Sequence, residues 1–201
     1  WRFAHDKMRE ALLENLEEPA TRAYSHQLAE AIESLYPNSP EYYATLAQHW
    51  ATAQQPRKES FYAFKAAERA LRAGANQRAL NFLERTLALH ENGSAPLDNI
   101  QYADLQLLIG QTYLSLGMLD KSSDYCRAAL KSTDIRGNVT IGGTLAQAIR
   151  QFRYRLFNPK PSREDAIRYR IASQACEVLA QNSFYNNDKI GGVYHVLLGL
   201  N

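Results

Sequence analysis

The fold is decided by residues 66–89, which read AAERALRAGANQRALNFLERTLAL. Apolar residues recur there every three or four positions on both sides of Gly74, which is the spacing of one face of an α-helix. Glycine tolerates the left-handed conformation that ends many helices. This stretch therefore predicts two helices, near 57–73 and 76–91, folded back on each other as an antiparallel hairpin.

Two later turns, at Gly117 and Asn187, can be placed in the same register as Gly74. A small residue precedes each turn by seven positions, and others follow it by five and twelve. A leucine follows each turn by thirteen positions. Hairpin by hairpin, these residues are Ala67, Ala79, Thr86 and Leu87; Gly110, Ser122, Ala129 and Leu130; and Ala180, Gly192, Gly199 and Leu200. Small side chains at these offsets let the two helices of a hairpin approach closely.

This register is the tetratricopeptide pattern, and it predicts an all-α fold in which antiparallel hairpins stack as a TPR-like α-solenoid. The turns lie 43 and 70 residues apart, instead of following a regular period of about 34 residues. The alternative is an irregular helical bundle whose small residues coincide by chance.

Helical periodicity extends along the whole chain, and strand-like alternation is nearly absent. Further helices are expected near 3–17, 20–35, 40–54, 98–116, 119–132, 141–157, 164–182 and 187–200. Proline is tolerated in the first turn of a helix, and Asn and Asp are good N-caps. The residues expected at helix starts on these grounds are Pro19, Pro40, Pro56, Asn76, and Asp98 or Asn99.

The composition of the 201 residues excludes several classes of protein. A formal net charge of +2 gives no overall attraction to nucleic acid or anionic membranes. No apolar run approaches membrane-spanning length, and residues 1–6 do not resemble a signal peptide. We expect a cytoplasmic protein without nucleic-acid or membrane partners. Cys126 and Cys176 are expected to be small buried residues of a reducing compartment; a disulfide is possible but has no support in the sequence.

The two ends of the chain suggest a segment of a longer polypeptide. The first residue is Trp1 instead of Met, and the chain stops within the apolar run 196–200. We expect the last hairpin to expose an apolar edge where a next repeat would stack, and the chain could self-associate through that edge.

Several short segments, taken in order, resemble one family of proteins. Residues 3–12, FAHDKMREAL, resemble the end of the winged-helix module of STAND-type signalling ATPases. Later segments resemble the helices after that module, a first tetratricopeptide hairpin, and the helical region of soluble class III adenylyl cyclases and hybrid sensor kinases with a predicted ATPase. The segments that carry the resemblance are 3–12, 26–33, 46–50, 65–89, 184–188 and 199–201.

The resemblance implies that a catalytic or kinase domain and a P-loop ATPase domain precede these residues in the intact protein. The chain has no GxxxxGK[ST] loop, and its glycine-dense stretch 137–144 lacks the lysine that holds a phosphate. We therefore expect neither catalysis nor a cofactor here. The expected divisions are a helical tail of the ATPase module (1–55), TPR-like hairpins (56–134), an inserted helical segment (135–165) and a truncated hairpin (166–201).

His5 and Asp6 are the sharpest candidate site. They resemble the histidine–aspartate pair of STAND ATPases, in which the histidine senses the phosphate of bound ADP, so this role would apply only in the intact protein. An imidazole can donate to a phosphate oxygen. The alternative is a surface or capping pair at a helix start. The five histidines show no HxxxH or HExxH spacing, so we expect no metal site.

Two other groups of residues are candidate partner-binding surfaces. Arg150, Arg153 and Arg155 belong to a basic stretch interleaved with aromatics, which suits an acidic protein or a sister domain of the same polypeptide. The alternative is a solvated helix face with its aromatics in the core. The aromatic stretches 41–43 and 61–64, with Tyr42, Tyr43 and Tyr62, could line a concave peptide groove or could pack between hairpins.

The leading functional hypothesis is a non-catalytic helical-repeat arm of a multidomain signalling ATPase, which contacts partner proteins or sister domains. One alternative is a part of an adenylyl cyclase or protein kinase whose catalytic domain lies outside these residues. Another is a stand-alone peptide-binding adaptor. The gene sequence upstream of Trp1 discriminates between them, because a P-loop with a cyclase or kinase domain would support the first two.

Overall fold

The computed structural model describes residues 17–133 and 162–199, which contain α-helices and one 3-10 helix but no strand. The prediction of an all-α fold is therefore confirmed. The elements are α2 (Glu18–Leu35), η1 (Pro40–Tyr42), α3 (Tyr43–Thr52), α4 (Pro56–Arg72), α5 (Asn76–Glu91), α6 (Asn99–Ser115), α7 (Leu119–Ser132), α9 (Arg163–Tyr185) and α10 (Lys189–Gly199). The expected helices near 3–17 and 141–157 lie outside the described residues.

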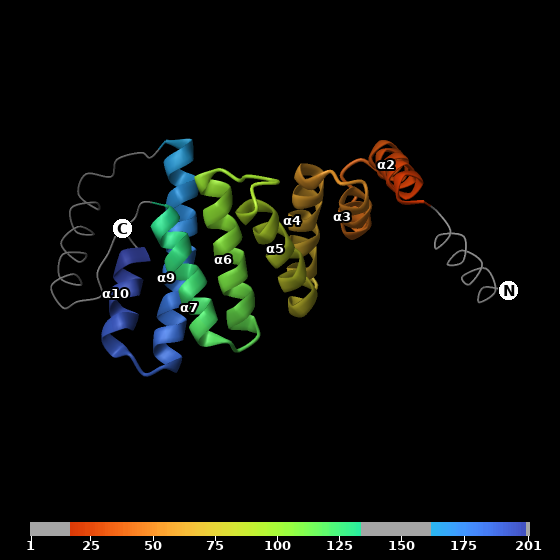
Figure 1. Ribbon diagram of the computed structural model, residues 1–201. Helices are drawn as coiled ribbons and strands as arrows, with labels where there is room; N and C mark the ends of the chain where they lie inside the picture. Colours follow the sequence, from red (N-terminus) through yellow and green to blue (C-terminus); the bar gives the residue numbers. More distant parts are fainter. Residues whose placement is uncertain (1–16, 134–161, 200–201) are drawn as a thin grey trace.

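Successive helices pack against one another in a row, which Figure 1 shows from α2 on the right to α10 on the left. Most of them are joined by short turns, so neighbours run in opposite directions. Helix α9 packs against both α6 and α7, so it follows α7 in the row although residues 133–162 lie between the two helices in the sequence. The row places α2 and α10 at opposite ends of the described structure.

The helix starts follow the sequence signals with one exception. Pro19, Pro40 and Pro56 each lie in a first turn, as expected. The Asp98 carboxylate accepts from the backbone N–H groups of residues 100 and 101, and Gln101 completes a capping box. The prediction that Asn76 is an N-cap is wrong, because the preceding turn ends at residue 75 and Asn76 is already the first helical residue.

The three turns placed in register have the same backbone geometry. Gly74, Gly117 and Asn187 have φ values of 71°, 76° and 57°. In each turn the next residue donates its N–H to the carbonyl five residues earlier, as Ala75 does to Ala70 at 2.9 Å. This is the Schellman motif, which satisfies the last carbonyls of the helix. A fourth turn of this kind, at Gln54 with φ 54°, was not predicted.

The small residues of the register lie where helices approach closely. A Cβ built on Gly110 would stand 2.5 Å from the Cys126 Sγ and 3.2 Å from the Ser122 carbonyl oxygen. Ala67, Ala79 and Ala129 have no exposed surface, and Thr86 and Ser122 are also buried. The close approach expected at these offsets is therefore seen at Gly110 in the second hairpin, and the small residues of the first hairpin are buried.

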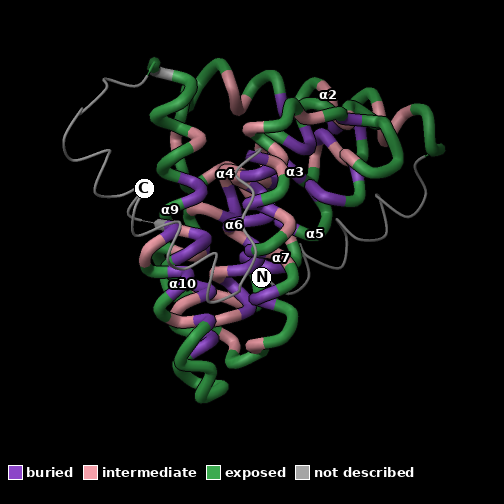
Figure 2. The backbone as a smooth tube through the Cα atoms, turned by 90° about the vertical axis from the view of Figure 1, so that its left-hand side faces the viewer, coloured by how far each residue is buried: buried purple, intermediate pink, exposed green. Residues whose placement is uncertain are grey.

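Three apolar clusters follow one another along the row. The first surrounds Trp50 between α2, α3 and α4, and the second surrounds Leu83 and Ile109 between α5 and α6. The third surrounds Cys126 and Leu179 between α7 and α9. Figure 2, which views the row from the α10 end, shows buried residues along the inner faces of the helices. Each helix is thus stabilised mainly by its neighbours in the row.

Candidate protein-interaction surfaces

The predicted partner-binding tyrosines lie where η1, α3 and α4 meet. Tyr42 stacks on Tyr36 with ring centroids 4.6 Å apart. The Tyr43 hydroxyl donates to the Asn38 carbonyl oxygen at 3.1 Å, and its ring lies 6.1 Å from that of Tyr62. All three predicted tyrosines are half-buried. They join neighbouring elements, and their expected contact with a partner stays a prediction.

Tyr62 belongs to a polar network centred on Glu33 of α2. The Trp50 Nε1 and the Lys58 Nζ each donate to the Glu33 carboxylate at 2.9 Å. Burial and a hydrogen bond to Glu33 raise the pKa of Tyr62 to about 12. Since Glu33, Trp50 and Lys58 come from α2, α3 and α4, this network fixes the three helices relative to one another.

A groove of about 620 Å³ lies between α4, the end of α5, the loop before α6, and α6. Phe61 and Phe64 of α4 and Leu97 of the loop form its apolar floor. Phe61 is 54% exposed, which is a large fraction for an aromatic residue. Within the stretch 61–64, the two phenylalanines line this groove, whereas Tyr62 packs toward α2 and α3.

The two walls of this groove differ in charge. Arg57 and Lys65 line the α4 side, and the Lys65 Nζ lies 3.8 Å from Glu68 and 5.9 Å from the Phe61 ring centroid. Asp104 lines the α6 side, where Arg170 of α9 pairs with it at 3.2 Å. Asp104 and Lys65 are thus each paired with a residue outside the groove lining, and the lining itself carries two cations on α4 against one carboxylate on α6.

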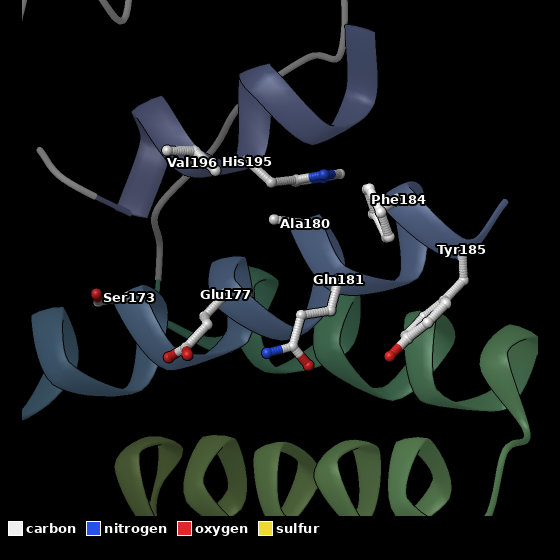
Figure 3. A pocket seen from close by; sticks show the side chains of 8 residues that line it. All are labelled: Ser173, Glu177, Ala180, Gln181, Phe184, Tyr185, His195 and Val196. Carbon is white, nitrogen blue, oxygen red and sulfur yellow. The ribbon is translucent and has the colours of Figure 1, made fainter. Parts of the chain in front are cut away.

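A second hollow surface lies at the end of the row, on α9 and α10. One pocket there has a volume of about 470 Å³. Its lining includes Glu177 and Gln181 on α9 and His195 and Val196 on α10 (Figure 3). A neighbouring hollow of about 680 Å³ shares Ala180, Phe184 and Val196 with it. His195 is buried, and burial lowers its pKa, so this side chain is neutral near pH 7. Most of the exposed lining of both hollows is apolar, although Glu177, Asp188 and Lys189 also line them.

The remaining predicted residues have the following outcomes. Cys126 and Cys176 are free and buried, as expected, and burial raises the pKa of each thiol to about 12. His5, Asp6, Arg150, Arg153 and Arg155 lie outside the described residues. Across 17–133 and 162–199, no group of three His, Cys, Asp or Glu side chains is arranged to hold a metal ion. None of the helices in these ranges is both long and apolar enough to cross a membrane.

Comparisons with known proteins identify no family for this chain. No protein-family model matches the sequence, and no curated protein matches it significantly. The resemblance to the helical arm of STAND-type signalling ATPases therefore rests on the sequence segments alone.

Proposed function

We propose that this chain is a non-catalytic protein-interaction arm built from TPR-like hairpins, and that it belongs to a larger cytoplasmic signalling ATPase. The equivalent turns at Gly74, Gly117 and Asn187 and the small residues around Gly110 support the repeat assignment. The order of the family-like segments supports the assignment to a signalling ATPase. The expected domain boundaries at 55, 134 and 165 remain part of this proposal.

The observation that carries the binding function is the groove between α4 and α6. An exposed aromatic ring on an apolar floor is a good anchor site for a partner side chain. Arg57 and Lys65 beside that floor favour an acidic group next to the anchor. The groove therefore suits an extended peptide in which Asp or Glu flanks a large apolar residue.

The test uses two labelled synthetic peptides and fluorescence anisotropy. One carries Asp and Glu on either side of Phe and Leu, and the other has Lys in place of both acids. We expect the acidic peptide to bind more tightly, and Lys65→Glu to weaken it about tenfold, because the rim charge is reversed. Phe61→Ala should weaken both peptides, since it removes the anchor site.

The matched control is Arg78→Glu, which reverses an exposed cation on α5 away from the groove lining. This change should leave the affinity of the acidic peptide within about twofold of the wild-type value. Equal affinity for the two peptides, or no response to Lys65→Glu, would show that the groove does not select acidic segments.

A further inference from the structure

The last hairpin of the row exposes apolar side chains at positions that are buried in the two earlier hairpins. Counted from the turn residue, the sixth position holds Leu80, Ser123 and Val193, and the ninth holds Leu83, Cys126 and Val196. The residues of the first two hairpins are buried at both positions, whereas Val193 and Val196 are 55% and 51% exposed. Together with Phe184 and Ile190, which are also exposed, these valines form what we call the α10 seat.

In the earlier hairpins, the first helix of the next hairpin covers these positions. Leu80 and Leu83 share a cluster with α6. Cys126 shares a cluster with α9 and also lies against Gly110 of α6, and Asn182 of α9 donates to Ser123. The covering residues are Leu105, Ile109 and Tyr113 on α6, and Ile171, Ala175 and Leu179 on α9. In each set the residues are four positions apart, so they form one face of the helix. The α10 seat therefore suits a helix with an apolar stripe of similar spacing.

Helix α2, at the opposite end of the row, presents such a stripe to solvent. Tyr24, Leu28, Ala31 and Leu35 are exposed, and they are spaced by four, three and four residues. This spacing places them on one face. The adjacent face, which includes Ala29, packs in the Trp50 cluster. Helix α2 is thus apolar on two neighbouring faces. The face with Ala29 packs in the Trp50 cluster, and the face with Leu28 is exposed.

We propose that α2 of a second copy docks on the α10 seat, in the position that α6 takes on α5 and α9 takes on α7. The contact joins two different surfaces at opposite ends of the row (Figure 1), so it is head to tail. Each added copy leaves one α2 and one seat open, and such a contact forms an open chain or a ring of copies.

The proposed contact between two copies repeats a type of interface that is already present inside the molecule. The row is held together by an apolar helix face on a seat of small and aliphatic residues, and the second copy repeats that arrangement. It does not depend on the peptide groove, because the groove is lined by α4, α5, α6 and the loop before α6. Loss of one property therefore leaves the other measurable.

Sedimentation velocity of the full chain, from low concentration to about 100 µM, tests the proposal. The wild-type chain should form species larger than a dimer as its concentration rises. Val196→Asp and Leu28→Asp should each yield monomers, since each places a carboxylate on one of the two surfaces. Leu28 and Val196 are both 51% exposed, so neither change should prevent folding, which circular dichroism checks.

An equimolar mixture of the two variants gives the decisive result. Each variant keeps one intact surface, so the mixture should form a one-to-one dimer and nothing larger. Met118→Asp, at an apolar position that is 47% exposed and lies outside the groove lining, α2 and the α10 seat, serves as the control and should associate like the wild type.

Three results would overturn the proposal. A wild-type chain that stays monomeric throughout the range has no such contact. Dissociation of Val196→Asp with unchanged association of Leu28→Asp would mean that two α10 seats pair symmetrically. A mixture that stays monomeric would mean that α2 and the seat do not bind each other. Peptide binding by the same variants, measured in parallel, reports on the groove separately.

Discussion

Helices α2, α3 and α4 are held together differently from helices α6, α7 and α9. In the first group the fully buried Trp50 of α3 lies at the centre of the apolar cluster, and its Nε1 donates to the Glu33 carboxylate of α2 at 2.9 Å. In the second group Gly110 lies against Ser122 and Cys126 with no room for a methyl group. There the Asn182 amide donates at 3.0 Å to the hydroxyls of both Ser122 and Ser123.

The difference lies in which kind of change each group should tolerate. The α2–α3–α4 group depends on one large side chain and on polar atoms that reach between helices, so the removal of atoms is costly. The α6–α7–α9 group depends on the absence of side-chain volume, so the addition of atoms is costly. Substitutions of opposite kinds therefore test the comparison.

Trp50→Ala should have the largest effect. It leaves a cavity in the first cluster and removes the donor to Glu33, so we expect the free energy of unfolding to fall by about 3–5 kcal/mol. Urea denaturation followed by circular dichroism measures this loss. Trp50→Phe keeps most of the apolar volume and should cost only about 1–2 kcal/mol. An equal loss in both variants would mean that the hydrogen bond, instead of packing, holds these helices.

The turns between successive helices show which features a sequence can specify. Gly74, Gly117 and Asn187 were identifiable because glycine and asparagine adopt positive φ for local reasons. Gln54 adopts the same conformation between α3 and α4, which pack together, but glutamine has no such local preference and so gives no signal in the sequence. Asparagine is a favourable N-cap residue, but the N-cap of α5 is Ala75, and Asn76 is the first residue of the helix.

The candidate surfaces could be predicted only in part, because they combine residues distant in sequence. The aromatic stretch 61–64 indicated a groove, but on a helix adjacent side chains point about 100° apart. Phe61 and Phe64 therefore face the groove while Tyr62 packs with Trp50. The pairing of Asp104 with Arg170 joins residues 66 apart in the chain, and no local pattern marks it.

Gly110→Ala should have the next largest effect. The added methyl group would press on Cys126 and on the Ser122 carbonyl, and we expect a loss of about 1–3 kcal/mol. Gly192→Ala is the matched control, since it is also a helical glycine but its nearest neighbour is the Ser183 Cβ at 3.8 Å. That change should raise stability by up to about 1 kcal/mol through helix propensity.

Thermal unfolding of the two glycine variants measures the predicted difference in sign. Adding Cys126→Ala should recover part of the stability lost in Gly110→Ala, because the Sγ atom is the nearest obstacle. If both alanine variants shift the unfolding temperature in the same direction, the close approach at Gly110 does not limit packing.

The smallest predicted effect is a difference in alkaline stability. Burial raises the pKa of Cys126 and Cys176 from 9.0 to about 12, so the folded chain keeps protons that the unfolded chain releases above pH 9. Stability should therefore fall as pH rises from about 9 toward 12. In the first group, burial and Glu33 raise the pKa of Tyr62 from 10.0 to about 12, so its contribution falls only above about pH 10.

Urea denaturation with a reductant at pH 8, 9 and 10 separates the two groups. Between pH 9 and 10 each thiol should account for about 1 kcal/mol of lost stability. Cys126→Ala and Cys176→Ala should flatten the decline over that interval, even though each also lowers stability at pH 8. Tyr62→Phe should change the decline there by only about 0.3 kcal/mol, because the unfolded tyrosine, with a pKa of 10.0, is half ionised only at the upper end of that interval. An unchanged slope in the cysteine variants would mean that the α6–α7–α9 group does not keep its thiols protonated, and hence that this packing admits solvent.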